Sequence, residues 1–532
     1  MSGDPVAVSA GDVPDGRRGP RIVISRQVAV CVVYVSGLFL STLDMTIVNV
    51  ALPTIGHAFD VPPTSVDTVS IFYLVSLAVS VPASGWLGDR FGGKRTLLTA
   101  VAVFTVGSAL CGTATSLGEL VAFRVLQGAG GGMLASVGMA MLLRAFAPSE
   151  RVRASAVLSI ANGLAPTLGP VLGGLLVTHV SWRAIFYVNV PVGVFATVFG
   201  LLCLRDDPAR PTERFDLAGF ALAASGFGLV MYGISEGPER GWTTPSVAAG
   251  LACGAVLVAA LVGVELRGRS PMIDVRLLTD RLFASGSAVM TVQSATFLGT
   301  LFTLTLYFQD ERGMSPQAAG LSTFPEALGV VVGSQLASRL LYRRLRPRRH
   351  LMLGAGGTSV TVALMGLLRE DTALWVVVLL LFCMGLCVGQ VFVGTQSASF
   401  ATVSASSSGR ASTLFNVGRR LGGAVGVAAA TSVLVSAGPS GQAASGGTPG
   451  ISGYRAAFLT VAALNLLGLY AATRVSDTEA ASTIPQPAGR SEPGTPEKAP
   501  KRPEKAPGTP EKSPRRPEKA PVKPQKEEEP QP

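Results

Sequence analysis

One acidic residue lies inside an apolar run near the start of the chain. Asp44 falls in the stretch LDMTIVNVALP (residues 43–53), at the end of an apolar run of about 23 residues, 28–50. A helix of that length can cross a bilayer. An ionised carboxylate near mid-membrane costs at least about 2.5–3.5 kcal/mol, so a retained one is usually paired or binds protons in service of transport. Asp44 is therefore a candidate proton-coupling group.

A basic residue in the fourth apolar run is a candidate partner for Asp44. This stretch reads RVLQGAGGGM from Arg124, and Arg124, Gln127 and Gly131 share one helical face. An arginine inside a span must face protein or water. At 1.5 Å rise per residue, Arg124 lies about 8 Å and Asp44 about 9 Å below the same membrane surface. We therefore expect an Asp44–Arg124 pair that couples protons; a purely structural pair is the alternative.

A second carboxylate, Glu326, lies in the tenth apolar run near mid-membrane. Gly329 and Gly333 share its helical face, so this face is narrow and could border a cavity. We expect Glu326, Gln127 and Asn49 to line the substrate cavity. A glutamate held by a neighbour for structural reasons is the alternative for Glu326.

Apolar runs long enough to span a membrane position all of these residues. Of 532 residues, 48% are hydrophobic and 14% are charged, against about 25% charged in soluble domains. The runs are too long for barrel strands, so we expect an all-α polytopic membrane protein. Fourteen transmembrane helices are predicted, at 28–50, 66–87, 96–116, 119–143, 153–178, 183–204, 216–236, 244–266, 281–309, 317–341, 351–368, 373–395, 411–437 and 454–473.

Arginine and lysine concentrate in alternate gaps between these spans, for example at 88–95, 144–153 and 342–350. Basic loops remain on the cytoplasmic side. We therefore expect a multi-pass protein of the cell membrane with both termini cytoplasmic. The same topology accounts for the net charge of +11, so nucleic acid is not an expected partner.

The gap between the second and third spans reads GWLGDRFGGKR. Its glycines let helix ends approach closely, its acid can cap or pair, and its basic residues anchor at the membrane surface. This loop is similar to the signature loop of the major facilitator superfamily, whose charged residues latch one conformation. The resemblance implies a latch; ordinary cytoplasmic charge is the alternative. The implied latch residues are Gly85, Asp89, Arg90, Lys94 and Arg95.

The fifth span carries GPVLGG, which resembles the antiporter motif of exporters in this superfamily. Glycines at this spacing allow close helix packing, and prolines bend the helix. Two upstream glycines of the motif are replaced by Ala156 and Ala165, which are still small. The implied motif residues are Pro166, Gly169, Pro170, Gly173 and Gly174.

As a set, the motifs resemble the fourteen-span drug:proton antiporters (EmrB/QacA type). LDMTIVNVALP is similar to that family's first helix, WRAIFYVNVPVG (182–193) to its sixth, SPMIDVRLL (270–278) to its connector before the ninth, and NVGRRLGGAVG (416–426) to its thirteenth. The stretch at Arg124 resembles the motif tied to proton transfer. The resemblance implies a major facilitator fold of two six-helix bundles plus two extra central helices. Some members use an acid in the tenth helix to select organic cations.

The chain divides into five expected parts. They are a disordered cytoplasmic tail (1–26), a six-helix bundle (27–204), two additional transmembrane helices with linkers (205–280), a second six-helix bundle (281–475) and a second cytoplasmic tail (476–532). The last part repeats PEKAP, and a Pro/Lys/Glu-rich composition cannot bury a core, so we expect it to be disordered.

The predicted function is proton-coupled efflux of a small amphipathic drug or antibiotic, conferring resistance or self-resistance. The expected partners are the small-molecule cargo, protons and the lipid bilayer. No cofactor is expected beyond the proton gradient, and we expect the protein to function as a monomer. An enzyme would need a nucleophile with a neighbouring base, and no such set is recognised in the sequence. The six cysteines indicate packing rather than a metal site, although Cys383 and Cys387 share a helical face. The alternatives are a proton-coupled importer of a nutrient or siderophore, against which GPVLGG argues, and a sensor that moves nothing.

Overall fold

The computed structural model describes residues 24–206, 215–268, 273–369, 371–404, 406–437 and 450–484. Regular structure within these ranges is helical. The predicted disordered tails fall outside the described residues, apart from 24–26 and 476–484.

Long helices occupy the positions of all the expected spans. They are α1 (Arg26–Phe59), α3 (Thr68–Phe91), α4 (Gly93–Thr113), α5 (Leu117–Ala145), α6 (Arg151–His179), α8 (Asn189–Cys203), α9 (Leu217–Arg240), α10 (Pro245–Arg267), α11 (Arg281–Leu306), α12 (Pro316–Leu336), α13 (Tyr342–Met365), α14 (Leu374–Ala398), α15 (Ser408–Ala437) and α16 (Gly450–Thr473). Short helices and turns connect them: α2 (Pro63–Val66), η1 (Pro148–Glu150), α7 (Ala184–Tyr187), η2 (Val275–Thr279), η3 (Tyr307–Glu311), η4 (Ala337–Leu341) and η5 (Glu479–Thr483).

Twelve helical segments of the described chain are long and apolar enough to cross a membrane. The helices α12 and α13, at the expected spans 317–341 and 351–368, are not among them. Polar residues such as Gln317 and Glu326 interrupt α12, and α13 begins with the arginine-rich sequence YRRLRPRRH. The structure therefore gives an all-α membrane fold with twelve candidate spans.

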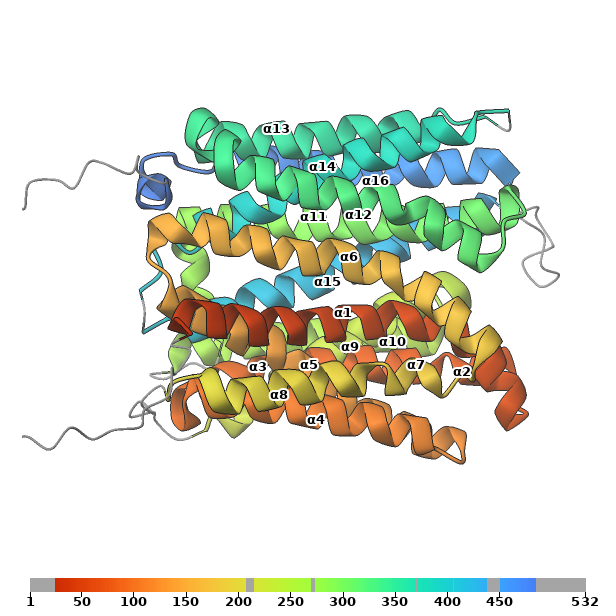
Figure 1. The fold of residues 1–532 in the computed structure, drawn as a ribbon, viewed down its shortest axis with the longest axis horizontal. Helices are drawn as coiled ribbons and strands as arrows, with labels where there is room; N and C mark the ends of the chain where they lie inside the picture. The colour runs from red at the N-terminus through yellow and green to blue at the C-terminus, as the bar shows by residue number, and fades with distance from the viewer. Residues whose placement is uncertain are drawn as a thin grey trace, which may run out of the picture. The chain divides into compact units, whose positions relative to one another are not determined.

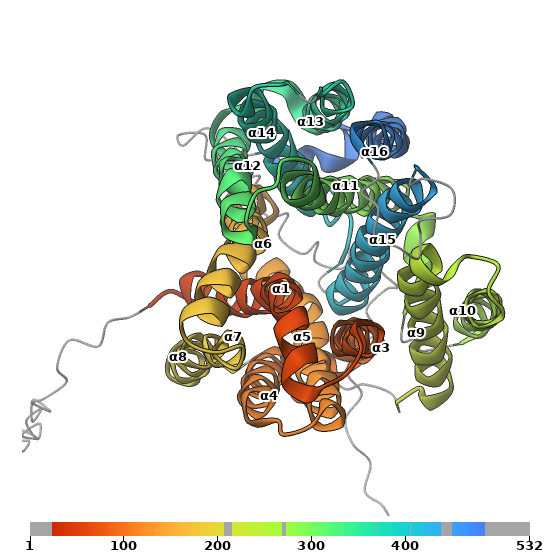
Figure 2. The ribbon, with the colours of Figure 1, turned by 90° about the vertical axis from the view of Figure 1, so that its right-hand side faces the viewer.

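The helices of residues 24–484 lie alongside one another (Figure 1). Viewed along their axes, α1, α3, α4, α5 and α8 form one group and α11, α12, α13, α14 and α16 form another (Figure 2). Contacts between α6 and α12, and between α15 and both α3 and α5, join the two groups. The pair α9 and α10 packs through α9 against α3 and α15.

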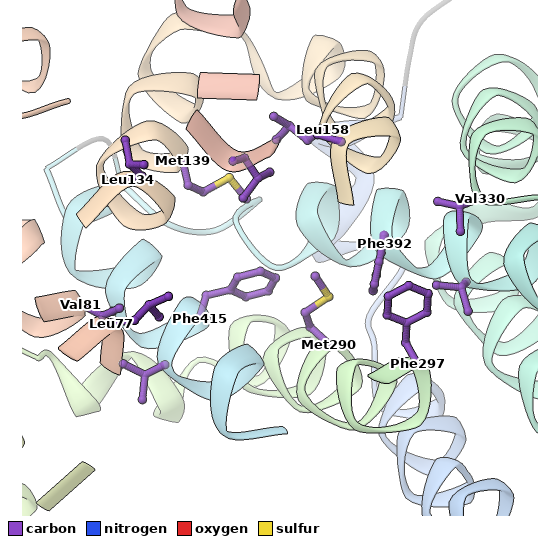
Figure 3. Packing of buried hydrophobic residues seen from close by; sticks show 14 of the residues in the cluster. Leu77, Val81, Leu134, Met139, Leu158, Met290, Phe297, Val330, Phe392 and Phe415 are labelled. Atoms are coloured by element: carbon purple, nitrogen blue, oxygen red, sulfur yellow. The ribbon is translucent and has the colours of Figure 1, made fainter. Parts of the chain in front are cut away.

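Apolar side chains fill the space between these helices. Figure 3 shows members of the largest cluster, including Leu77 of α3, Met290 and Phe297 of α11, Phe392 of α14 and Phe415 of α15. All five side chains are buried. Inside a membrane, packing of this kind contributes most to helix association, because lipid tails are as apolar as the side chains.

The first helix is longer than its apolar run. We expected a span at 28–50, but α1 continues through Pro53 to Phe59. It ends at Asp60, where φ is 52° and the backbone N–H bonds to the carbonyl groups of Gly56 and His57. Asp44 therefore lies well inside a 34-residue helix.

The expected loop at 88–95 is a break of one residue. Helix α3 continues to Phe91 and α4 begins at Gly93, with Gly92 between them at φ 86° and ψ 145°. A positive φ favours glycine, which has no Cβ. The expected loop at 342–350 is also mainly helical and breaks at Arg346, at φ 63° and ψ 159°, just before Pro347. The connection between the second and third expected spans and the connection between the tenth and eleventh therefore both break at one residue with a positive φ and an extended ψ.

Candidate functional site

The carboxylate of Asp44 in α1 meets the guanidinium of Arg124 in α5. The distance from Arg124 Nη1 to Asp44 Oδ2 is 2.5 Å, and the two side chains are 1% and 0% exposed. Gln127 Nε2 donates to Asp44 Oδ1 at 2.8 Å, and Asn189 Nδ2 of α8 donates to the same oxygen at 3.1 Å. Three donors on two other helices therefore hold the buried carboxylate, as its ionised form requires.

The guanidinium of Arg124 has further partners. Its Nη1 donates to Gln127 Oε1 at 2.7 Å, and its Nε donates to the Val69 carbonyl at 3.4 Å. Its Cζ lies 3.9 Å from the centre of the Tyr73 ring, which places the cation over an aromatic face. Arg124 is therefore compensated by charge, by hydrogen bonds and by an aromatic ring.

Small residues on α5 allow this contact. A Cβ on Gly128 would lie 2.6 Å from the Tyr73 carbonyl oxygen of α3, and a Cβ on Gly131 would lie 3.2 Å from Ser41 Oγ of α1. Larger residues at these positions would push α5 away from its neighbours. The glycines beside Arg124 in the sequence thus bring its helix within reach of Asp44.

A cavity of about 600 Å³ lies beside the pair. Its walls come from α1, α3, α6, α9, α11 and α15, with single residues from α5, η3, α12 and α14. Arg124 and Tyr73 line it, whereas Asp44 lies behind them and does not. Its volume is in the range of small-molecule sites, and its walls are mainly apolar side chains such as Met231 and Phe297.

The expected cavity residues are only partly at the cavity. Asn49 lines it and accepts a hydrogen bond from Ser70 Oγ at 3.2 Å. Gln127 does not line it, because its amide is 0% exposed and bonds to Asp44 and Arg124.

Glu326 also differs from the expectation, because it is covered rather than lining the cavity. Its side chain is 0% exposed, and Thr167 Oγ1 of α6 donates to Oε2 at 3.4 Å. Its Oε1 has no hydrogen-bond partner in the described part of the chain. A Cβ on Gly329 or Gly333 would overlap backbone carbonyl oxygens of α14. The narrow face that suggested a cavity is a helix-packing face.

Two of the expected latch residues meet the start of α15. A Cβ on Gly85 would lie 3.4 Å from the Gly409 carbonyl oxygen, and a Cβ on Gly409 would lie 3.4 Å from Asp89 Oδ2. The carboxylate of Asp89 is therefore near a helix N-terminus, which favours negative charge. Arg144 Nη1 of α5 also donates to Asp89 Oδ1 at 3.4 Å.

The other expected latch residues, Arg90, Lys94 and Arg95, have different surroundings. Lys94 pairs with the exposed Asp206 at 3.6 Å, and the side chains of Arg90 and Arg95 are exposed. These basic residues are placed where positive charge would meet lipid headgroups or water.

The antiporter-motif residues of α6 form its contacts with α1 and α12. A Cβ on Gly169 would overlap Thr46, and one on Gly173 would lie 3.0 Å from the Ile47 carbonyl oxygen. A Cβ on Gly174 would lie 2.8 Å from Gln317 Cγ of α12. Pro166 and Pro170 line the cavity. The motif thus places α6 between the two helix groups, next to the cavity.

Comparison with known proteins places this architecture in a family. The family model "Major Facilitator Superfamily" matches residues 34–427. The chain belongs to this superfamily. It is therefore a multi-pass membrane transporter and not an enzyme.

Curated relatives within the superfamily are named as drug-resistance proteins. The chain is 32% identical over 393 residues to the tetracenomycin C resistance and export protein of Streptomyces glaucescens, covering 74% of this chain and 73% of that protein. It is 33% identical over 409 residues to a multidrug resistance protein B homolog of Mycobacterium tuberculosis, covering 76% and 75%. These relatives agree with the resemblance to drug:proton antiporters.

Solved superfamily structures share the fold. The human organic anion transporter MFSD10 matches with a TM-score of 0.59 at 18% identity, covering 84% of this chain and 99% of that chain. The proton:xylose symporter XylE matches with a TM-score of 0.58 at 14% identity, covering 84% and 94%.

Several site residues were not predicted individually. Asn189 lies in the stretch WRAIFYVNVPVG, and Tyr73 lies in an ordinary apolar span, so neither carried a signal of its own. Arg419 and Arg420 of α15 line the cavity. Two arginines inside an apolar run indicate side chains that face protein or water, and the same reasoning that identified Arg124 could have found them.

Proposed function

We propose that this superfamily member exports a small amphipathic drug or antibiotic in exchange for protons. The observation that carries the proposal is the buried Asp44–Arg124 pair, whose arginine borders the cavity while its acid lies directly behind. The export direction is supported by the names of the curated relatives, one of which is a resistance and export protein.

Proton coupling follows from the partners of Asp44. In the present arrangement Arg124, Gln127 and Asn189 all donate to the carboxylate, and together they satisfy its charged form. A proton becomes the better partner only when Arg124 withdraws, because burial then disfavours the charge. Since Arg124 also forms part of the cavity wall, a cargo or a helix movement that draws the guanidinium away can trigger proton uptake.

The two ends of the helix bundle differ in a way that suggests an alternating-access cycle. At the end that holds Gly92, Arg151 Nη1 donates to the Phe400 carbonyl at 2.9 Å, and Gly85 packs on Gly409. The cavity is lined by parts of the helices further from this end, including Pro53 and Glu239. If the basic end is cytoplasmic, this conformation faces outward, and Asp89 stabilises it at the closed end.

The membrane topology is proposed to have fourteen spans. In this arrangement α12 and α13 also cross the bilayer. Their polar residues make them less apolar than the twelve helices that qualify as spans by length and composition. The halves 27–204 and 281–475 form six-helix bundles, and 205–280 supplies two further spans. Both termini are cytoplasmic, and the protein functions as a monomer. The shared backbone form at Gly92 and Arg346 supports the division into two related halves.

The energetics are sufficient for efflux. A proton that moves down a gradient equivalent to about 150 mV yields roughly 3.5 kcal/mol. That energy sustains a cargo gradient of a few hundred-fold for a one-to-one exchange.

Everted membrane vesicles that contain the full chain test this proposal. After respiration acidifies the vesicle lumen, each drug of a resistance panel is added and the pH gradient is followed with a fluorescent weak base. An antiporter dissipates the gradient in the presence of its cargo, and cells that express it tolerate the same drug. If no drug in the panel moves protons or changes susceptibility relative to vesicles and cells without the chain, the proposal is wrong.

A further inference from the structure

We infer that the cargo carries an acidic group, such as a carboxylate or phenolate, that binds at Arg419 and Arg420 of α15. This inference rests on the proposed export function and names the class of compound exported. Three observations support it: the position of the two arginines, their lack of protein partners, and the scarcity of acids at the cavity.

The two arginines lie at the centre of the molecule. They follow Ser408, the first residue of α15, by 11 and 12 positions, so they lie about 17 Å from the start of the helix, measured along its axis. Helix α15 packs against α3, α5 and α9 as well as α11, between the two helix groups (Figure 2). Both side chains line the 600 Å³ cavity. They therefore meet whatever occupies it.

Neither arginine has a partner in the described part of the chain. No hydrogen bond or ion pair joins Arg419 or Arg420 to another described residue, and Arg420 Nε and Nη2 are buried without an acceptor. Arg124 of α5, which also lines the cavity, has a carboxylate, two further acceptors and an aromatic ring. Buried guanidinium donors without an acceptor, such as Nε and Nη2 of Arg420, are costly. The unpaired donors therefore favour a ligand that brings the acceptor.

Protein carboxylates do not fill this need in the observed arrangement. Asp44 already accepts three hydrogen bonds and lies behind Arg124. Glu326 is enclosed between α6 and α12. Among the described residues that line the cavity, Glu239 near the end of α9 is the only acid. The centre of the cavity is therefore positive, and a cationic cargo would be repelled there.

The shape of the site restricts the anion further. A guanidinium binds planar oxyanions such as carboxylates with two parallel hydrogen bonds. The surrounding walls are apolar, with Met231, Phe297 and Phe302 among them. An inorganic anion would leave these walls without contacts, so the site fits an organic anion with an apolar body.

Three radiolabelled compounds that share a naphthalene ring and carry a negative, a neutral and a positive substituent test the inference: naphthoate, naphthalenemethanol and naphthylmethylammonium. Binding is measured by equilibrium dialysis with the full chain in nanodiscs of zwitterionic lipid, without a proton gradient. We expect naphthoate to bind about tenfold more tightly than the alcohol, as a charged hydrogen bond allows, and the ammonium to bind weakest. In the variant Arg419→Gln/Arg420→Gln, naphthoate should lose about tenfold while the alcohol stays within about twofold.

Two further variants separate charge from packing. Arg419→Lys/Arg420→Lys keeps the positive charge but loses the two parallel hydrogen bonds of a guanidinium, so its preference for naphthoate should be weaker than that of the wild type. If the glutamine variant does not fold, this weakened preference becomes the decisive result. Arg410→Gln removes another arginine of α15, which lies 4.0 Å from Asp274 and does not line the cavity, and should change nothing.

Several results would overturn the inference. The first is equal affinity of the wild type for the three compounds, or tightest binding of the ammonium. The second is a preference for naphthoate that is unchanged in the glutamine variant or in the lysine variant. The third is an equal loss of affinity for all three compounds in the glutamine variant. A protein that prefers naphthoate but moves no protons with any drug would instead refute the proposed export and leave the anion site standing.

Discussion

Neutralising one member of the Asp44–Arg124 pair should destabilise the fold more than neutralising both. Removal of one partner from a buried ion pair costs about 3–5 kcal/mol, because the other charge stays buried. Arg124 is 1% exposed, so Asp44→Asn should fall within that range. Arg124→Gln should cost less, because Gln127 and Asn189 still donate to the carboxylate. The double variant has no buried charge at the site, so we expect a coupling energy of about 2–3 kcal/mol.

The measurement is equilibrium unfolding of the four proteins in mixed detergent micelles, followed by tryptophan fluorescence. The exposed pair Lys94–Asp206 provides a control cycle, because its 3.6 Å contact involves an aspartate that is 76% exposed. Such surface pairs contribute about 0–1 kcal/mol. If the losses at Asp44 and Arg124 are additive, like those of the control cycle, the two charges do not depend on each other and the reasoning fails.

Three further predictions follow from the backbone, the closed end and the charge of the cargo. Gly92→Ala should lower the stability by about 1–3 kcal/mol because its φ is 86°, whereas Arg346→Gly should not, because Arg346 already has a φ of 63°; the reverse order in thermal unfolding would contradict the break geometry. Asp89→Asn should weaken the contact with the start of α15 and lengthen spin-label distances across that end, and unchanged distances would remove Asp89 from the latch. Export of one anion per proton moves two charges, so a potential of about 100 mV should contribute roughly 4.6 kcal/mol; an accumulation ratio of the anion that does not respond to a potassium–valinomycin potential would contradict this exchange.

The sequence was informative about depth within the membrane. Asp44 and Arg124 each interrupt an apolar run, and counting residues from the ends of the runs placed them at one level. The structure has them in contact. That contact also needed the right faces, which the glycines at 128 and 131 help to set by bringing α5 against α3 and α1.

The sequence was less informative about neighbours. Periodicity places Gly329 and Gly333 on the face of Glu326, but it does not say that α14 covers that face. Hydropathy marks where a run stops being apolar, not where the helix ends, so α1 and α3 extend beyond their expected limits. Arg419 and Arg420 interrupt an apolar run as Arg124 does, but only the cavity shows what they border.

Proton movement by the Asp44→Asn variant is the most direct test of the central claim. Purified wild type, Asp44→Asn and the surface control Asp206→Asn are reconstituted in proteoliposomes with one cargo identified from the drug panel. Each is assayed for cargo-driven proton flux and for exchange of labelled against unlabelled cargo. We predict that Asp44→Asn exchanges cargo but moves no protons, while Asp206→Asn does both. Proton flux in Asp44→Asn equal to that of the wild type would show that another group carries the proton.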